Sequence, residues 1–195
     1  MNRTRCFRIV RIALVAAGTV ALPKVALAAP VAITKLYPTG VNDTGALLAD
    51  QTLDGHWTVA SSTDPANPGP NLYAFPATLS PISTGSWVAN TATGRWLTLN
   101  PTDPNTASNA VFTFKVVIDL NGYQPGTASV TLRMAADDDY KISLNGTTTG
   151  ITRNNAYGSF ANHTIATGWQ AGMNTLTFSV NNSGGGPTGF FVTTI

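Results

Sequence analysis

Apolar and polar side chains alternate along several short stretches of this chain, most clearly within Ser129–Gly150. Every second position is apolar in Val130–Met134 and again in Tyr140–Leu144, a period typical of strands with one buried face. The three carboxylates of Asp137–Asp139 interrupt the pattern, and Asn145-Gly146 is a strong hairpin signal. The stretch therefore predicts a hairpin of two adjacent strands, with carboxylates crowded at one end of a sheet.

The same period recurs along the chain and predicts about ten short strands and no helix. Besides the two above, the expected strands are Val31–Leu36, His56–Ala60, Leu72–Phe75, Arg95–Leu99, Val111–Ile118, Phe160–Ile165, Asn174–Asn181 and Gly189–Thr194. Trp57 and Trp96 lie in such strands and are expected in the core. Polar segments such as Thr147–Gly158 predict turns, and the looser segment before residue 110 is expected to wrap around the rest. The pattern predicts an all-β fold, an antiparallel sandwich or jelly roll.

The first 28 residues have the features of a secretory signal peptide. Four arginines lie among the first eleven residues, Ile9–Leu22 is mostly apolar, and Ala26-Leu27-Ala28 is a small-x-small cleavage site. The alternative, an uncleaved membrane anchor, is less favoured because the apolar run is short. We therefore predict a signal peptide at 1–28 and a single β-sandwich domain at 29–195. The mature protein is expected to be secreted, periplasmic or extracellular, without a membrane segment.

Cleavage changes the charge of the protein. The full chain has a net charge of +2, but the part after residue 28 keeps six Lys and Arg against nine Asp, a net charge of −3. No basic patch remains for nucleic acid. Glu is absent, and a chain rich in Thr, Asn and Gly favours strands and turns over helices. Cys6 is the only cysteine and lies in the signal peptide, so the mature chain has no disulfide.

A series of short motifs carries a family resemblance. In chain order they are Asp54–Val59 (DGHWTV), Ser86–Asn90 (SWVAN), Arg95–Pro101 (RWLTLNP), Ala135–Asp138 (AADD), Leu144–Gly146 (LNG), Ala171–Phe178 (AGMNTLTF) and Pro187–Phe190 (PTGF). Together they resemble a class of bacterial secreted domains with a galactose-binding-like β-sandwich, similar to carbohydrate-binding modules. The resemblance implies a jelly-roll sandwich with a non-catalytic binding or structural role, and it implies no particular ligand. The triple Asp departs from the single Asp or Asp-Asn more usual there.

The ionisable residues form no recognisable catalytic motif. A glycosidase needs two carboxylates on opposite sides of a sugar bond, and the adjacent Asp137–Asp139 do not fit that arrangement. The two histidines, His56 and His163, are distant in sequence, and no Gly-x-Ser-x-Gly motif is present. A zinc site is disfavoured for the same reason. We therefore expect a protein that is not an enzyme.

Calcium is the metal that the sequence favours. Asp137, Asp138 and Asp139 offer hard oxygen ligands on one turn, and Asn145 is a further candidate ligand. The carbonyls of Gly184–Gly186 are alternative ligands to Asn145. A solvated acidic turn without a metal is the interpretation favoured over calcium.

A sugar site requires exposed aromatic rings beside hydrogen-bonding groups, because sugars have apolar faces and hydroxyl rims. Trp87, Tyr157 and Trp169 lie near loops or strand ends and are the candidate platforms, and Asn90 and Arg95 are the candidate hydrogen-bonding groups. The leading hypothesis is therefore a secreted protein that binds carbohydrate or a cell-surface glycan.

The alternative hypothesis is a structural subunit of an extracellular matrix or surface filament. In that case the protein self-associates, and Val31–Leu36 pairs with the sheet edge of a neighbouring molecule.

Overall fold

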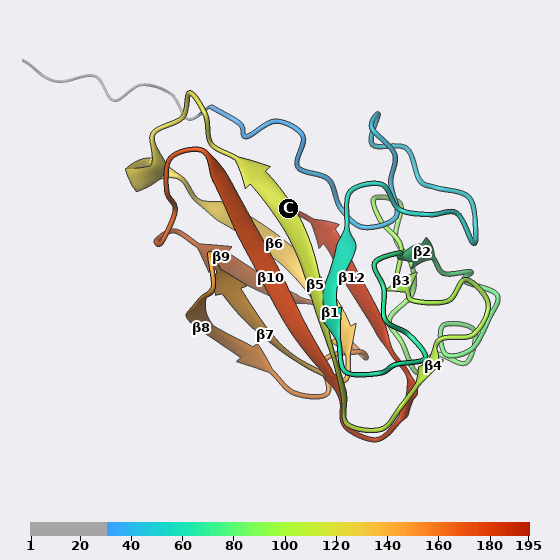
Figure 1. Ribbon diagram of the computed structural model, residues 1–195. Coiled ribbons are helices and arrows are strands. Elements are labelled where there is room, and N and C mark those ends of the chain that lie inside the picture. Colours follow the sequence, from blue (N-terminus) through green and yellow to red (C-terminus); the bar gives the residue numbers. More distant parts are fainter. Residues whose placement is uncertain (1–30) are drawn as a thin grey trace, which may run out of the picture. The chain divides into compact units, whose positions relative to one another are not determined.

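Two five-stranded antiparallel sheets form most of the structure, a computed structural model that describes residues 31–195. The strand order is β1-β5-β10-β7-β8 in the first sheet and β2-β3-β12-β6-β9 in the second (Figure 1). Residues Ile33–Ile195 form one compact unit. The predicted signal peptide, residues 1–28, lies outside the described residues.

The strands are short except for two. The first sheet contains β1 (Thr58–Ser62), β5 (Ala110–Asp119), β10 (Met173–Asn182), β7 (Asp139–Leu144) and β8 (Thr147–Arg153). The second contains β2 (Tyr73–Ala74), β3 (Leu97–Thr98), β12 (Gly189–Thr194), β6 (Val130–Asp137) and β9 (Ala161–Ile165). A separate pair is formed by β4 (Asn105–Thr106) and β11 (Gly186–Pro187). The described residues contain one short 3₁₀ turn, η1 (Pro125–Thr127), and no helix among them is long and apolar enough to span a membrane.

The main core lies between the two sheets. Alternate residues of β5 and β10, such as Phe114 and Phe178, are fully buried, and they meet Phe190 of β12 in the other sheet. The rings of Phe114 and Phe190 stack with centroids 4.9 Å apart. Trp57 packs against Phe178 and Phe190 in the same cluster. The alternation read from the sequence is thus confirmed, and the fold is an all-β antiparallel sandwich.

A second, smaller cluster covers the outer face of the second sheet. Ala135 of β6 and Phe191 of β12 are buried although they point away from the main core. The loop between β2 and β3 folds over them and contributes Trp87 and Trp96, whose rings stack 4.2 Å apart. Part of the segment before residue 110, the β2–β3 loop, therefore covers the sandwich as expected, whereas β1, β2 and β3 of the same segment belong to the sheets.

The predicted hairpin of Ser129–Leu144 is wrong. The strand β6 belongs to the second sheet and β7 to the first, so the chain crosses between the sheets at Asp137–Asp139. Alternation shows that a strand has a buried face but does not show which strand it pairs with. The turn at Asn145-Gly146 is confirmed, because it joins β7 to its antiparallel partner β8, with φ of 51° and 80° at its two residues.

Two further expectations are corrected. The segment Val31–Leu36 forms no strand, whereas Thr147–Arg153, expected to be turns, is the strand β8. Threonine suits a strand, but in β8 it occupies the positions where the sequence pattern requires an apolar residue. No residue of the edge strand β8 is fully buried, so the alternation of apolar and polar residues in its sequence is weak.

Candidate functional site

The acidic triplet lies where the chain crosses between the sheets, and its first carboxyl group is buried. Asp137 is 7% exposed, and its Oδ2 accepts a hydrogen bond of 2.5 Å from Nε1 of Trp87. Burial raises the pKa of Asp137 to about 8, and a hydrogen bond to Asp138 and the charges of Asp138 and Asp139 act in the same direction. Asp137 is therefore protonated at neutral pH and donates to its neighbour.

The other two carboxylates tie the crossing to loops on either side. Oδ2 of Asp138 accepts hydrogen bonds from both the backbone N–H and the hydroxyl of Ser183, each at 2.9 Å. Burial pushes the pKa of Asp138 up, but the hydrogen bonds from Asp137 and Ser183 outweigh it and hold the pKa below the usual value. Oδ1 of Asp139 accepts from the backbone N–H of Asn155 at 2.9 Å. The hydrogen bonds of Asp138 and Asp139 thus stabilise the crossing between the two sheets.

The structure does not bring the four predicted calcium ligands together. Asn145 follows the last residue of β7 and Asp139 is its first, so about 20 Å separates them at 3.3 Å per residue. Within residues 31–195 no three side chains of His, Cys, Asp or Glu are grouped as a metal site requires. Asp137–Asp139 and Asn145 therefore cannot bind one ion jointly.

Trp87 is not the exposed platform that the sequence suggested. It is 2% exposed, since its ring lies between Trp96 and Phe75 over the outer face of the second sheet. Gly189 of β12 lies directly beneath, and a Cβ at that position would be 2.4 Å from Cη2 of Trp87. Burial of this large ring covers sheet residues that would otherwise contact water, which explains why a loop tryptophan is in a core.

Three more of the predicted residues lie around the same loop and hold it in place. Asn90 accepts a hydrogen bond from the backbone of Trp96 and donates one to the carbonyl of Phe75. The half-buried Tyr157 packs on the smaller cluster, and its carbonyl accepts from Val88. Arg95 forms an ion pair with Asp50. The structure thus brings Trp87, Asn90 and Tyr157 close together, but as supports of a covering loop.

Trp169, the last predicted platform, lies in the other cluster. It is 8% exposed, belongs to the main core, and donates from Nε1 to the carbonyl of Ile165 at 3.0 Å. Its ring anchors the loop between β9 and β10. The neighbours of Trp169 in that loop, Gly168 and Gln170, line a surface groove.

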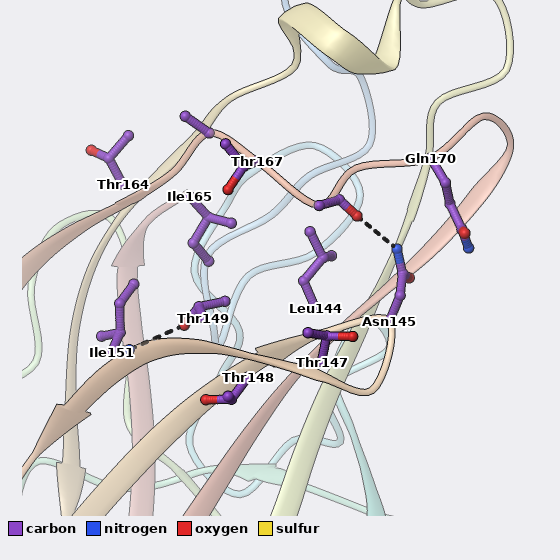
Figure 2. Close-up of a pocket in the computed structure, with 12 residues that line it drawn as sticks. Leu144, Asn145, Thr147, Thr148, Thr149, Ile151, Thr164, Ile165, Thr167 and Gln170 are labelled. Carbon is purple, nitrogen blue, oxygen red and sulfur yellow. Dashed lines mark hydrogen bonds between the residues drawn. The ribbon is translucent and has the colours of Figure 1, made fainter.

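This groove is the candidate binding site. It has a volume of about 450 Å³ and lies between β8 and the β9–β10 loop (Figure 2). Its lining is Leu144, Asn145, Thr147, Thr148, Thr149, Ile151, Thr164, Ile165, Ala166, Thr167, Gly168 and Gln170. Figure 2 shows Leu144 between Thr147 on one side and Thr167 on the other. The apolar floor is the end of the main core, because Leu144 and Ile165 belong to it.

Two asparagines hold the walls of the groove together. Nδ2 of Asn145 donates to the carbonyl of Gly168 at 3.3 Å, shown in Figure 2, and to Oδ1 of Asn174 at 2.8 Å. Asn174 is fully buried, and its amide also bonds to the backbone of Gln170 and Gly172. Asn174 was not among the residues predicted from the sequence. Asn174 lies two residues before Leu176 on the side of β10 that faces the core, so the sequence pattern places a polar amide where an apolar side chain is expected.

The groove offers neutral hydrogen-bonding groups. The side chains of Thr147, Thr167 and Gln170 line it and form no hydrogen bond with another described residue. Thr149 is already engaged, since its hydroxyl donates to the carbonyl of Ile142. None of the lining residues carries a charge or an aromatic ring. The arrangement suits an uncharged ligand with hydroxyl groups and an apolar side.

Comparison with known proteins gives neither a family nor a relative in sequence. No family model matches the chain, and no curated protein matches it significantly. The structure is similar to several solved sugar-binding domains.

One is a CBM35 module from Paenibacillus barcinonensis, at 12% identity over 75% of this chain and all of that one, with a TM-score of 0.33. Another is TmCBM61, solved with β-1,4-galactotriose, at 15% identity over 78% of this chain and 89% of that one, with a TM-score of 0.38. A third is the PA14 sugar-binding domain of an RTX adhesin, at 19% identity over 74% of this chain and 68% of that one, with a TM-score of 0.29.

Two of these neighbours are carbohydrate-binding modules and the third is a sugar-binding domain. Similarities this low carry no argument about a ligand or a site. The fold class rests on the two antiparallel sheets themselves.

Proposed function

We propose that this protein is a secreted, non-catalytic β-sandwich that binds an uncharged portion of a carbohydrate in the groove between β8 and the β9–β10 loop. The observation that carries the proposal is a set of hydroxyl and amide groups, on Thr147, Thr167 and Gln170, that form no hydrogen bond within residues 31–195 and lie above a floor of Leu144 and Ile165. The signal-peptide pattern of residues 1–28 supports secretion.

The chemistry of the groove matches that of a neutral sugar. Sugar hydroxyls need donors and acceptors at the rim, and the C–H faces of the ring need apolar contact. A volume of about 450 Å³ lies within the usual range for small-ligand sites. The groove has no aromatic ring on which a sugar face can stack, so we expect modest affinity.

The lining also supports a role without catalysis. Hydrolysis of a glycosidic bond uses two carboxyl groups that flank the bond, and general acid–base catalysis needs an ionisable side chain within reach of the substrate. The residues that line the groove include neither. A sugar held there contacts only neutral groups.

The test is titration calorimetry of the purified protein with a panel of neutral oligosaccharides. We expect saturable binding that weakens roughly tenfold in Thr167→Val and in Gln170→Ala, because each variant removes a hydrogen-bonding group at the rim. The matched control is Thr152→Val, an exposed β8 threonine that does not line the groove. It should bind like the wild type.

Two results would contradict the proposal. One is that no neutral saccharide binds; the other is that the groove variants bind as tightly as the control. Size-exclusion chromatography of the same samples addresses the structural alternative, since a subunit of a filament or matrix forms large assemblies without any sugar. Titrations with calcium and with a chelator show whether the metal contributes.

A further inference from the structure

A second pocket lies on the outer side of the first sheet, at the edge formed by β1 and β5. Its volume is about 450 Å³, and it shares no lining residue with the groove. It is lined by Lys35, Tyr37, Gly55, His56, Thr58, Lys115, Val116 and Val117. Thr58 and Lys115 are direct partners across the β1–β5 ladder, so their side chains emerge side by side.

Several donors in this pocket have no partner in the part of the chain that the structure describes. The side-chain ammonium groups of Lys35 and Lys115 form no ion pair or hydrogen bond with a residue of 31–195. The hydroxyl of Thr58 and the backbone N–H of Gly55 are likewise unpaired there. Two lysines, a threonine with an unpaired hydroxyl and a glycine with an unpaired backbone N–H therefore all line one pocket. No carboxylate is among the lining residues.

The wall of the pocket is held in place by its own contacts. The rings of Tyr37 and His56 stack at 4.0 Å and 21°. The carbonyl of Tyr37 accepts a hydrogen bond from Nε1 of the buried Trp57, and Nε2 of His56 lies 2.9 Å from Oδ1 of Asp43. The Asp43 side chain is 93% exposed, so solvent and salt screen its negative charge. The two lysines are the permanently charged residues in the lining of the pocket.

We propose that this pocket binds a tetrahedral oxyanion, a sulfate or phosphate group, either free or as an ester on a saccharide. Lysine ammonium groups act as point charges toward such anions, and hydroxyl and backbone N–H donors complete the set. The site is separate from the neutral groove and does not depend on the proposed function. It gives a protein of net negative charge after signal cleavage a local preference for an anionic group.

The test compares sulfate and phosphate with chloride at constant ionic strength, by calorimetry on the purified protein. A second arm compares a sulfated oligosaccharide with its unsulfated parent. We expect saturable binding of the oxyanion, weakened roughly tenfold or more in Lys115→Gln and in Lys35→Gln, since each loses a charge-assisted contact. The matched control is Lys141→Gln, on an exposed position of β7 outside the pocket.

The two arms identify the source of the anion. Binding of free sulfate or phosphate assigns the pocket to the ion itself, whereas binding of only the sulfated saccharide assigns it to the ester. Circular dichroism of each variant confirms that it is folded. The proposal is overturned when no oxyanion binds saturably, or when Lys141→Gln loses as much affinity as the pocket variants. Neutral-sugar binding should be unchanged in Lys115→Gln, so a failure here and a failure at the groove are distinguishable.

Discussion

Replacement of Asp137 by Asn should remove much of the pH dependence of stability of this protein. In the folded state Asp137 is buried, accepts from Trp87 and has a pKa raised to about 8, whereas an exposed aspartate titrates at 3.8. The folded protein therefore keeps a proton that the unfolded chain releases. The contribution of Asp137 to stability therefore falls as pH rises from about 4 to about 8.

The magnitude follows from proton linkage. One proton of difference between the two states changes the free energy of unfolding by about 1.4 kcal/mol per pH unit, so Asp137 contributes a loss of roughly 2–3 kcal/mol between pH 5 and pH 7. The lowered pKa of Asp138 contributes stability that is lost only as pH falls below its unfolded value of 3.8, outside this range. Burial lowers the pKa of His163, so this group makes the protein more stable as pH rises. Burial raises the pKa of Asp54, so this group, like Asp137, makes the protein less stable as pH rises.

Asparagine is a suitable replacement because it retains both hydrogen bonds. Its oxygen can accept from Trp87 and its NH₂ group can donate to Asp138, as the protonated carboxyl group does. Urea denaturation of wild type and Asp137→Asn at pH 5, 6 and 7 gives the difference, in which the contributions of His163 and Asp54 cancel. Asp119→Asn, at an exposed position on β5, is the control. Equal pH slopes in wild type and Asp137→Asn would refute the assignment of a buried, protonated carboxyl group.

Two further substitutions test the packing and the groove. Gly189→Ala should lower stability by about 1–3 kcal/mol in thermal denaturation, because the new Cβ would overlap the ring of Trp87. The control, Gly126→Ala, has open space around its Cβ and should change stability by less than about 0.5 kcal/mol. Equal melting temperatures of the two variants would contradict this packing. Asn174→Ala should cost about 2–3 kcal/mol in urea denaturation and weaken neutral-sugar binding, because it removes the buried amide that fixes the β9–β10 loop. Asn181→Ala, on the same strand but without a side-chain hydrogen bond to another described residue, should do neither, and similar losses in both variants would argue against this role of Asn174.

The fold class was predictable because burial of one face of a strand produces an alternation of apolar and polar residues over a few consecutive positions. In β5 and β10 every second side chain is buried, and that period is visible in the sequence. The turn at Asn145-Gly146 was predictable for a similar reason, since its positive φ values restrict the residue types that suit it. The pairing of strands leaves no such trace, which is why β6 and β7 were taken for one hairpin.

The candidate site was harder to predict because its lining comes from segments that are separate in the sequence and meet only in the folded protein. Trp87 and Trp169 lie in loops, and only the surfaces they cover, such as Phe191 for the smaller cluster, explain their burial. Nothing in the sequence distinguishes Thr167 and Gln170 from other loop residues. They line the groove because hydrogen bonds of Asn145 and Asn174 hold their loop beside β8. The pocket of Lys35 and Lys115 joins residues that no sequence motif connects.

The strand order has a consequence for how the protein is made. β10 is the central strand of the first sheet, and β12 is the central strand of the second, yet both come late in the chain, within Met173–Thr194. A chain still emerging from the ribosome has β5 and β7 without the strand that joins them, and β3 and β6 likewise. Neither sheet can close before this segment is released, so folding depends on contacts between distant parts of the sequence and should be slow. A chain shortened before Met173 should aggregate through its open strand edges.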